Sequence, residues 1–187
     1  MFKKLIFTIA VIISAFTFVS AQTLPSLAKL ANDARYTDKD KTFSIWMAGE
    51  PKDIQTIAPA DPVKGSTKTM YRWDAEEGFF SVTRSVFEHR TFDTDKDLDE
   101  YLTQVKTALI KTPDTKLDSE KKVTLEKWRG SEFTFITGNG IKTIVRALTA
   151  ANKAYILAVT IDHRVTDAEK LSIKAFDSFK ITEQASQ

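Results

Sequence analysis

A run of acidic residues is the first arrangement in the sequence that could bind a metal ion. Residues 93–99 read Asp-Thr-Asp-Lys-Asp-Leu-Asp, and carboxylate oxygens are the ligands that Ca²⁺ prefers. A calcium-binding EF-hand loop starting at Asp93 needs glycine at its sixth position and glutamate at its twelfth, where this sequence has Leu98 and Gln104. Carboxylates are also favoured at a helix N-terminus, where they interact with the helix dipole. The segment therefore predicts a helix start, and the sequence predicts neither a metal site nor a cofactor site.

The two histidines are the next candidates for chemistry. His89 and His163 each precede an arginine, Arg90 and Arg164, and each follows a predicted strand. Two roles are open to them: a general base at His89 near Asp93, and a two-histidine metal site. Neither role is supported by an HExxH motif or a similar spacing. Solvated histidines in loops are the simpler interpretation.

Nucleophilic catalysis and nucleotide binding have no motif in this sequence. A G-x-S-x-G nucleophile motif is absent. The six glycines leave little room for a phosphate-binding loop, and Gly138-Asn139-Gly140 predicts a hairpin turn instead. The chain has no cysteine, which excludes disulfides, thiol nucleophiles and thiolate metal sites. The sequence thus provides no catalytic residues and favours a protein that is not an enzyme.

A tryptophan beside an arginine is the clearest sign of a binding surface. Trp128 and Arg129 precede Gly130 in a predicted turn between two strands, and Trp and Arg dominate the energetics of protein interfaces. The alternative is that Trp128 covers the end of the core beside Phe133. We take Trp128 and Arg129, together with His89 and Arg90, as the candidate partner-binding residues.

Residues 1–21 have the pattern of a cleavable signal peptide. Lys3 and Lys4 precede an apolar stretch, and Val19-Ser20-Ala21 places small residues before a cut at Gln22. The apolar stretch is about 15 residues long, whereas a spanning helix needs about 20; an uncleaved anchor is the alternative. We expect a periplasmic or secreted protein with no stable membrane span after cleavage.

The charge balance of the exported chain argues against nucleic-acid binding. Removing Lys3 and Lys4 from the 27 basic residues leaves 25, equal to the 25 acidic residues. A neutral chain with interspersed charges lacks the basic surface that nucleic acids require. An envelope or extracellular protein of unknown identity is the expected partner.

The pattern of apolar residues predicts a strand-rich domain. Aromatic and β-branched runs predict strands at 42–47, 67–73, 79–87, 122–127, 131–137, 141–150 and 155–161. Segment 54–64 contains prolines and is interpreted as an irregular edge or loop. Strand 155–161 is apolar on both faces, which predicts a central strand that is covered on both sides.

Two helices are predicted to cover this sheet. The first spans 97–111, with Thr94 and Asp97 as its capping box, and the second begins at the capping box Thr166-x-x-Glu169. The hairpin connections make the sheet mainly antiparallel, so the predicted fold class is α+β, an α/β/α sandwich. The predicted organisation is an arm at 22–41 whose leucine spacing suits a short helix, a single domain at 42–182, and a frayed tail at 183–187.

Short segments spread over residues 43–181 resemble the PsbP-like superfamily. They are Phe43-Ser-Ile-Trp-Met-Ala-Gly-Glu-Pro51, Ser119-Glu-Lys-Lys-Val-Thr-Leu125, Gly130-Ser-Glu-Phe133, Arg146, the strand 155–160 and Lys174-Ala-Phe-Asp-Ser-Phe-Lys180. The first segment departs from the superfamily pattern, because Ala48 stands where a proline is usual. The resemblance implies an α/β/α sandwich around an antiparallel sheet. It carries no catalytic motif.

Members of this superfamily act through protein contacts, as an extrinsic photosystem II subunit and as a Ran-binding nuclear-transport factor. The resemblance therefore favours an exported, non-enzymatic binding or assembly module. The alternative is a small-molecule-binding protein or small enzyme with a pocket between sheet and helix, using His89, Arg84 or a buried Asp or Glu.

Overall fold

The computed structural model describes residues 24–30, 34–60, 65–111, 114–162 and 166–182. The predicted signal peptide, the predicted tail, His163 and Arg164 lie outside these ranges. The helices are α2 (Leu27–Leu30), α3 (Asp95–Ile110) and α4 (Thr166–Ser178). The strands are β1 (Arg35–Thr37), β2 (Phe43–Trp46), β3 (Asp53–Ile57), β4 (Ser66–Ala75), β5 (Gly78–Phe87), β6 (Thr115–Leu125), β7 (Trp128–Thr137), β8 (Ile141–Ala150), β9 (Lys153–Asp162) and β10 (Lys180–Ile181).

Seven strands form the main sheet, in the order β3-β4-β5-β9-β8-β7-β6. Each neighbouring pair in it is antiparallel. Strand β9 is the middle strand, as its two apolar faces predicted. Leu157 and Val159 pack on one face of the sheet, and Ala154 and Ala158 pack on the other.

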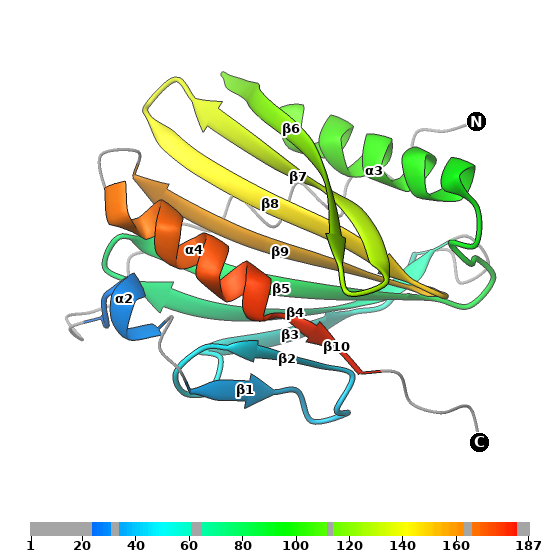
Figure 1. The fold of residues 1–187 in the computed structure, drawn as a ribbon, viewed down its shortest axis with the longest axis horizontal. Coiled ribbons are helices and arrows are strands. Elements are labelled where there is room, and N and C mark those ends of the chain that lie inside the picture. The colour runs from blue at the N-terminus through cyan, green and yellow to red at the C-terminus, as the bar shows by residue number, and fades with distance from the viewer. Residues whose placement is uncertain (1–23, 31–33, 61–64, 112–113, 163–165, 183–187) are drawn as a thin grey trace.

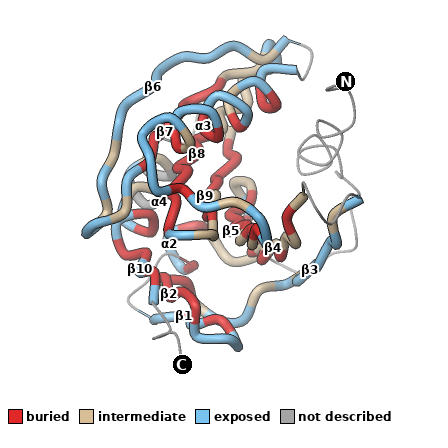
Figure 2. The backbone as a smooth tube through the Cα atoms, turned by 90° about the vertical axis from the view of Figure 1, so that its right-hand side faces the viewer, coloured by how far each residue is buried: buried red, intermediate tan, exposed pale blue. Residues whose placement is uncertain are grey.

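Both faces of the main sheet are covered, which confirms the predicted α+β sandwich. Helix α4, helix α2 and a small sheet in the order β1-β2-β10 lie on one face, and α3 lies on the other (Figure 1). The edge strands β3 and β6 are largely exposed, whereas the strands between them are largely buried (Figure 2). Within the described residues, no helix is long and apolar enough to cross a membrane.

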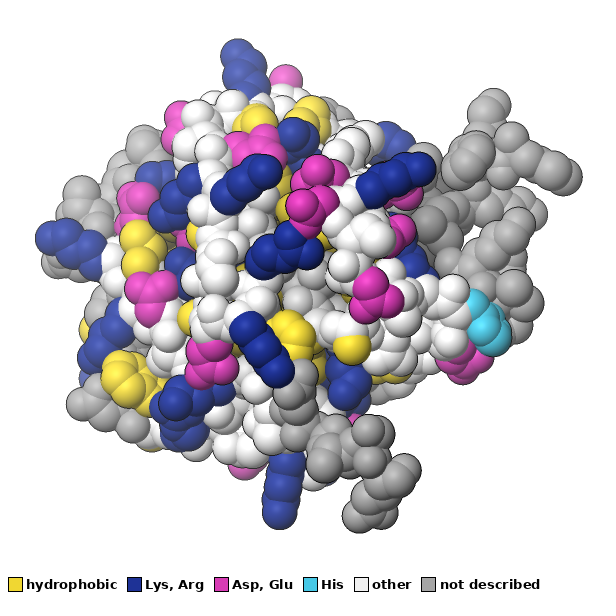
Figure 3. Space-filling model, turned by 45° about the vertical axis from the view of Figure 1, so that its right-hand side comes forward, with side chains coloured by type: hydrophobic (Ala, Val, Ile, Leu, Met, Phe, Trp, Pro, Cys, Tyr) yellow, Lys and Arg dark blue, Asp and Glu magenta, His cyan; other side chains and the backbone are white. Residues whose placement is uncertain are grey.

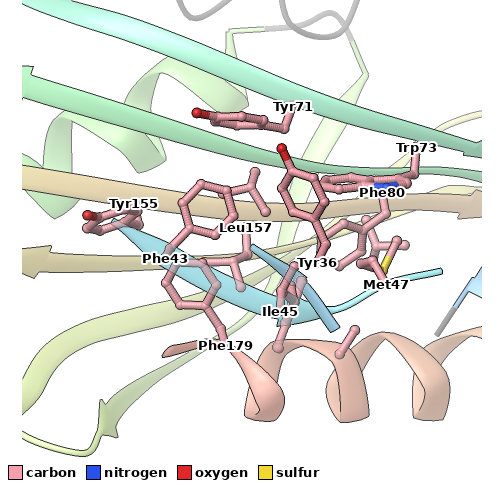
Figure 4. Packing of buried hydrophobic residues seen from close by; sticks show 14 of the residues in the cluster. Tyr36, Phe43, Ile45, Met47, Tyr71, Trp73, Phe80, Tyr155, Leu157 and Phe179 are labelled. Carbon is pink, nitrogen blue, oxygen red and sulfur yellow. The ribbon is translucent and has the colours of Figure 1, made fainter. Parts of the chain in front are cut away.

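An aromatic core fills the space between the main sheet, the small sheet and α4. Phe43 of β2 contacts Phe179 and Tyr71, with ring centroids 5.4 Å and 5.0 Å away. Tyr155 of β9 also contacts Phe179, at 5.4 Å. Phe43, Ile45 and Phe179 lie between the strands and α4 (Figure 4). Tilted and edge-on aromatic pairs of this kind add stability beyond the area they bury.

A second core lies between α3 and strands β7, β8 and β9. The buried side of α3 presents Leu98, Leu102, Val105 and Leu109. They pack in one cluster with sheet residues that include Phe133, Phe135, Val145 and Ala147. The helix predicted at 97–111 is therefore confirmed as α3, and these apolar side chains form its buried face.

The turn between β6 and β7 lies two residues earlier than the sequence pattern predicts. Leu125 pairs with Trp128, so Glu126 and Lys127 form the turn and Trp128 begins β7. Glu126 has a positive φ of 54°, a conformation that hairpin turns of two residues require. The glycine at 130 misled the prediction. It lies inside β7, where an added Cβ would stand 1.8 Å from the carbonyl oxygen of Ala147.

Candidate functional site

The acidic run at 93–99 forms the start of α3. Thr94 is the N-cap, and its hydroxyl oxygen accepts a hydrogen bond from the backbone N–H of Asp97 at 3.2 Å. This is the capping interaction that the sequence predicts. Asp93 accepts a hydrogen bond from the Thr91 hydroxyl at 2.6 Å. Within the described ranges, no three His, Asp or Glu side chains gather closely enough to hold a metal ion.

Two of the four predicted partner-binding residues meet at the first turn of α3. Arg129 of β7 donates a hydrogen bond to the Asp95 carboxylate. Arg90, in the segment before α3, donates to the backbone carbonyl of Asp97 at 3.0 Å. The Arg90 guanidinium also lies over the Phe92 ring, 5.0 Å from its centroid. Residues far apart in the sequence thus place two arginines at one end of α3.

His89 is an exposed side chain next to Arg90. Its Nε2 lies 4.0 Å from the Glu88 carboxylate, and 60% of the side chain is exposed. Asp93, the residue considered as its partner, bonds with Thr91 instead. The structure therefore leaves His89 exposed in the segment before α3, near Glu88, while Asp93 bonds with Thr91.

Trp128 lies on the other face of the β6–β7 hairpin from Arg129, because consecutive strand residues point to opposite faces. Its ring is half-buried and packs, with Val123 and Leu125, against the aromatic core. Lys127 places its Nζ 4.8 Å from the centre of the ring. The alternative that Trp128 covers part of the core is therefore supported, but the core it covers is the aromatic core, and Phe133 belongs to the second core on the opposite face.

Arg84, named in the small-molecule alternative, lies in a polar cluster that joins the β1–β2 turn to β5. Its Nη1 donates to the Thr42 hydroxyl at 2.8 Å and to the Asp38 carboxylate at 3.2 Å. Its Nη2 donates to the Asp40 carboxylate at 2.8 Å. The guanidinium is therefore bonded to the protein's own acidic groups. An aspartate beginning a turn is common, but nothing in the sequence linked Asp38 to Arg84.

Asp38 is the centre of this cluster, and its side chain is fully buried. One carboxylate oxygen accepts from the backbone N–H of Thr42 at 2.6 Å and of Phe43 at 2.8 Å. The other oxygen accepts from the Thr42 hydroxyl at 2.9 Å as well as from Arg84. A buried charge is tolerated when it is paired and fully hydrogen-bonded in this way. The cluster fixes the small sheet against the main sheet.

Tyrosines surround the cluster and are kept neutral by burial. Burial raises the pKa of Tyr155 to about 12, and its hydroxyl lies 3.5 Å from the Thr42 carbonyl. Burial also raises the pKa of Tyr36 to about 12. The hydroxyl of Tyr36 and the Nε of Arg84 are buried and have no hydrogen-bond partner among the described residues. A neutral phenol of such high pKa is a poor general base near pH 7.

Replacing Tyr36 by phenylalanine should make the protein more resistant to alkali. An unfolded tyrosine ionises near pH 10, whereas Tyr36 in the folded protein ionises near pH 12. Its contribution to stability is therefore complete below pH 10 and is lost between pH 10 and 12, at about 1.4 kcal/mol per pH unit. Phenylalanine removes this loss, so we expect a higher alkaline unfolding midpoint in circular dichroism titrations.

The same variant should be at least as stable as the parent at pH 7, because the Tyr36 hydroxyl has no partner within the described part of the chain and a buried unpaired group costs about 1–3 kcal/mol. Tyr155→Phe is the control: it also removes an alkaline titration, but it should give no gain at pH 7. A Tyr36→Phe protein that unfolds at the parental alkaline midpoint would contradict the assignment.

Sequence reasoning missed a second buried ionic cluster, which lies beneath α4. Arg146 of β8 donates from Nε and Nη2 to one oxygen of Glu132, at 2.9 Å and 2.7 Å. Its Nη1 donates to Asp177 of α4 at 2.7 Å. Lys121 of β6 contacts the other Glu132 oxygen at 2.7 Å. An arginine within the apolar run of β8 is the signal that could have revealed this cluster.

Comparison with known proteins identifies the fold. No family model and no curated protein matches the sequence. Among solved structures, the solution structure of cyanobacterial PsbP (CyanoP) from Synechocystis sp. PCC 6803 matches with a TM-score of 0.51 and 13% identity, over 80% of this chain and 92% of that chain. A crystal structure from Bacteroides thetaiotaomicron VPI-5482 matches with a TM-score of 0.41 and 12% identity, over 80% of this chain and 48% of that chain. The CyanoP match confirms a PsbP-like fold, and it carries no residue-level role.

Proposed function

We propose that the protein is an exported, non-enzymatic binding or assembly module that acts through protein contacts in the periplasm or outside the cell. Its binding surface comprises Arg129, Arg90 and His89 near the first turn of α3, and it continues around the end of the β6–β7 hairpin to the half-buried Trp128 on the opposite face of that hairpin. We call this the hairpin surface. Its partner is an envelope or extracellular protein.

The observation that carries this proposal is the exposure of the ion pair between Arg129 and Asp95 on the hairpin surface. The Arg129 side chain is 49% exposed, and that of its partner Asp95 is 78% exposed. Exposed ion pairs contribute about 0–1 kcal/mol to folding. The fold therefore has little need of this pair, and both charges remain accessible to a partner. Arginine and tryptophan are also the residues that most often dominate protein interfaces.

The polar cluster around Arg84 supports the small-molecule alternative less well. Arg84 is already bonded to Asp38, Asp40 and Thr42. These contacts hold the small sheet in place, so a ligand would have to break them in order to bind there. Across the face of the molecule shown in Figure 3, basic and acidic side chains are interspersed. That distribution suits local, specific contacts better than a broad electrostatic attraction.

Arg129→Ala and Trp128→Ala should each weaken partner capture by about 10-fold or more, since hot-spot truncations cost about 2 kcal/mol or more. The tagged full-length protein is expressed in its native host and crosslinked in the envelope. Proteins that copurify with the processed form are then identified and quantified. The melting temperature of Arg129→Ala should stay near that of the parent, because the pair it breaks is exposed.

Lys96→Ala is the matched control, since Lys96 also lies in the first turn of α3 and its side chain is 84% exposed. It should leave partner capture unchanged. Undiminished capture by Arg129→Ala and Trp128→Ala would remove the hairpin surface from consideration. A processed, folded protein that captures no partner would contradict the binding-module proposal and favour the small-molecule alternative.

A further inference from the structure

The two edges of the main sheet are built differently. Edge strand β6 includes Lys116, Asp118, Glu120, Lys121 and Lys122, and its pairing with β7 shifts register between Leu117 and Ser119. Charged side chains and bulges of this kind prevent an exposed edge from pairing with another chain. The β6 edge is therefore protected against association.

The opposite edge, β3, lacks this protection. Its five residues include a single charged residue, Asp53. Ile54 is 43% exposed and Ile57 is 37% exposed, and they are two of the four exposed large apolar side chains in the described part of the chain. One side of β3 pairs with β4, and β3 forms the end of the sheet (Figure 2). An edge strand with only one charged residue and with exposed β-branched residues is suited to strand pairing.

We propose that β3 pairs antiparallel with β3 of a second copy of this chain, across a two-fold axis at Gln55. A two-fold axis between antiparallel strands is perpendicular to the sheet. The face that α3 covers in one copy is therefore continuous with the face that α3 covers in the other copy. Centring it on Gln55 pairs all five residues of both strands. The two main sheets then join into one continuous sheet.

The side chains of β3 are complementary to themselves in this register. Ile54 lies opposite Thr56 of the second copy, which gives two β-branched pairs on one face. Gln55 lies opposite its own copy, and an amide can both donate and accept a hydrogen bond. Asp53 lies opposite Ile57 of the second copy, so no like charges meet. This self-complementarity is the reason for choosing a second copy over an unrelated partner strand.

The contacts within the monomer leave β3 available for this pairing. The Gln55 side chain donates to Asp53 at 2.5 Å, within the same strand. The Thr56 hydroxyl lies 3.3 Å from that of Thr69, on the inner neighbour β4. Ile54 and Ile57 pair with Tyr71 and Lys68, also on β4. Each of these contacts is made within β3 or toward β4, so a second copy can approach the outer edge without breaking them.

The first test is the oligomeric state of the exported protein, measured by sedimentation velocity over a range of concentrations. We expect a concentration-dependent dimer. The double variant Ile54→Lys with Ile57→Lys should raise the dimer dissociation constant by about 100-fold or more, since burying one isoleucine is worth about tenfold in affinity or more. Both side chains are exposed in the monomer, so the variant should keep its fold.

The control carries the same substitutions at the other two exposed apolar positions, Ile110→Lys with Leu117→Lys. It should dimerise as the parent does. A parent that sediments as a monomer up to millimolar concentration overturns the proposal. A dimer that persists in the Ile54→Lys with Ile57→Lys variant also overturns the proposal, and it would show that the chains associate through another surface.

The second test fixes the register by disulfide formation. The chain has no cysteine, so Gln55→Cys introduces a single thiol. Opposed residues of an antiparallel pair have Cα atoms about 4.5–5.5 Å apart, which suits a disulfide. Gln55→Cys should form a covalent dimer at least about tenfold faster than Thr124→Cys on the β6 edge. Equal rates at the two edges would contradict the pairing of β3, whether or not the hairpin surface binds a partner.

Discussion

Replacing Asp38 by alanine should lower the free energy of unfolding by about 3–5 kcal/mol, the cost of breaking a buried ion pair from one side. The variant leaves the backbone N–H groups of Thr42 and Phe43 without their acceptor. It also removes a buried partner of Arg84, whose side chain is only 12% exposed. For a domain of ordinary stability, whose free energy of unfolding is about 5–15 kcal/mol, this loss is a large fraction of the total. Urea unfolding followed by tryptophan fluorescence measures the loss.

Asp40→Ala is the control, because Asp40 binds the same arginine but its side chain is 62% exposed. We expect it to cost about 1 kcal/mol or less. The comparison therefore separates burial from mere pairing with Arg84. Equal losses for the two variants would show that the Asp38 carboxylate does not hold the small sheet in place.

Gly130→Ala should also be strongly destabilising, at about 3 kcal/mol. The new Cβ would stand 1.8 Å from the carbonyl oxygen of Ala147 and 3.1 Å from the Cα of Leu148. Both atoms belong to the backbone of β8, so neither can rotate away. Strands β7 and β8 would have to separate locally, and the packing of the second core beside them would loosen.

Gly49→Ala distinguishes this clash from the general effect of losing a glycine. Gly49 has a φ of 73° and no atom within 4 Å of a new Cβ, so only backbone strain opposes alanine there. That strain costs about 1–2 kcal/mol. Thermal unfolding of both variants gives the comparison, and a Gly130→Ala protein no less stable than Gly49→Ala would contradict the close approach of β7 and β8.

The elements that the sequence predicted well are those with strong local signals. Helix α3 has a cap and a single apolar stripe, and the middle strand β9 is apolar on both faces. A short turn between Ala75 and Gly78 joins β4 to β5. Periodicity and turn residues determine these elements with little help from distant contacts, so one sequence suffices to find them.

The elements that the sequence missed depend on distant neighbours. Strands β1 and β10 have three and two residues, and both exist because they pair with β2. The charged first half of β6 lacks the alternation of a half-buried strand, since it is an exposed edge. Short or exposed strands have no period of their own to detect.

The candidate site was predictable in its residues but not in its geometry. Trp128 and Arg129 stood out as a pair, yet they lie on opposite faces of a strand because the turn falls at Glu126 and Lys127. Asp38 and Arg84 are 46 residues apart, and Glu132 and Arg146 are 14 apart. Only the strand register brings such partners together, and a one-residue shift in register reverses which face each side chain occupies.

The pairing of β5 with β9 has a consequence for how the chain folds as it is made. In the main sheet, Gly78 pairs with Ile161, and in the small sheet, Ser44 pairs with Lys180. Neither sheet can therefore be completed before the C-terminal segments of the chain have been synthesised. Folds that depend on such non-local pairs form slowly, because the entropy of closing long loops is lost before the stabilising contacts can form. A growing chain can complete its local hairpins, but it cannot close its sheet until β9 has emerged. The main sheet and the small sheet are therefore completed only after most of the polypeptide has been synthesised.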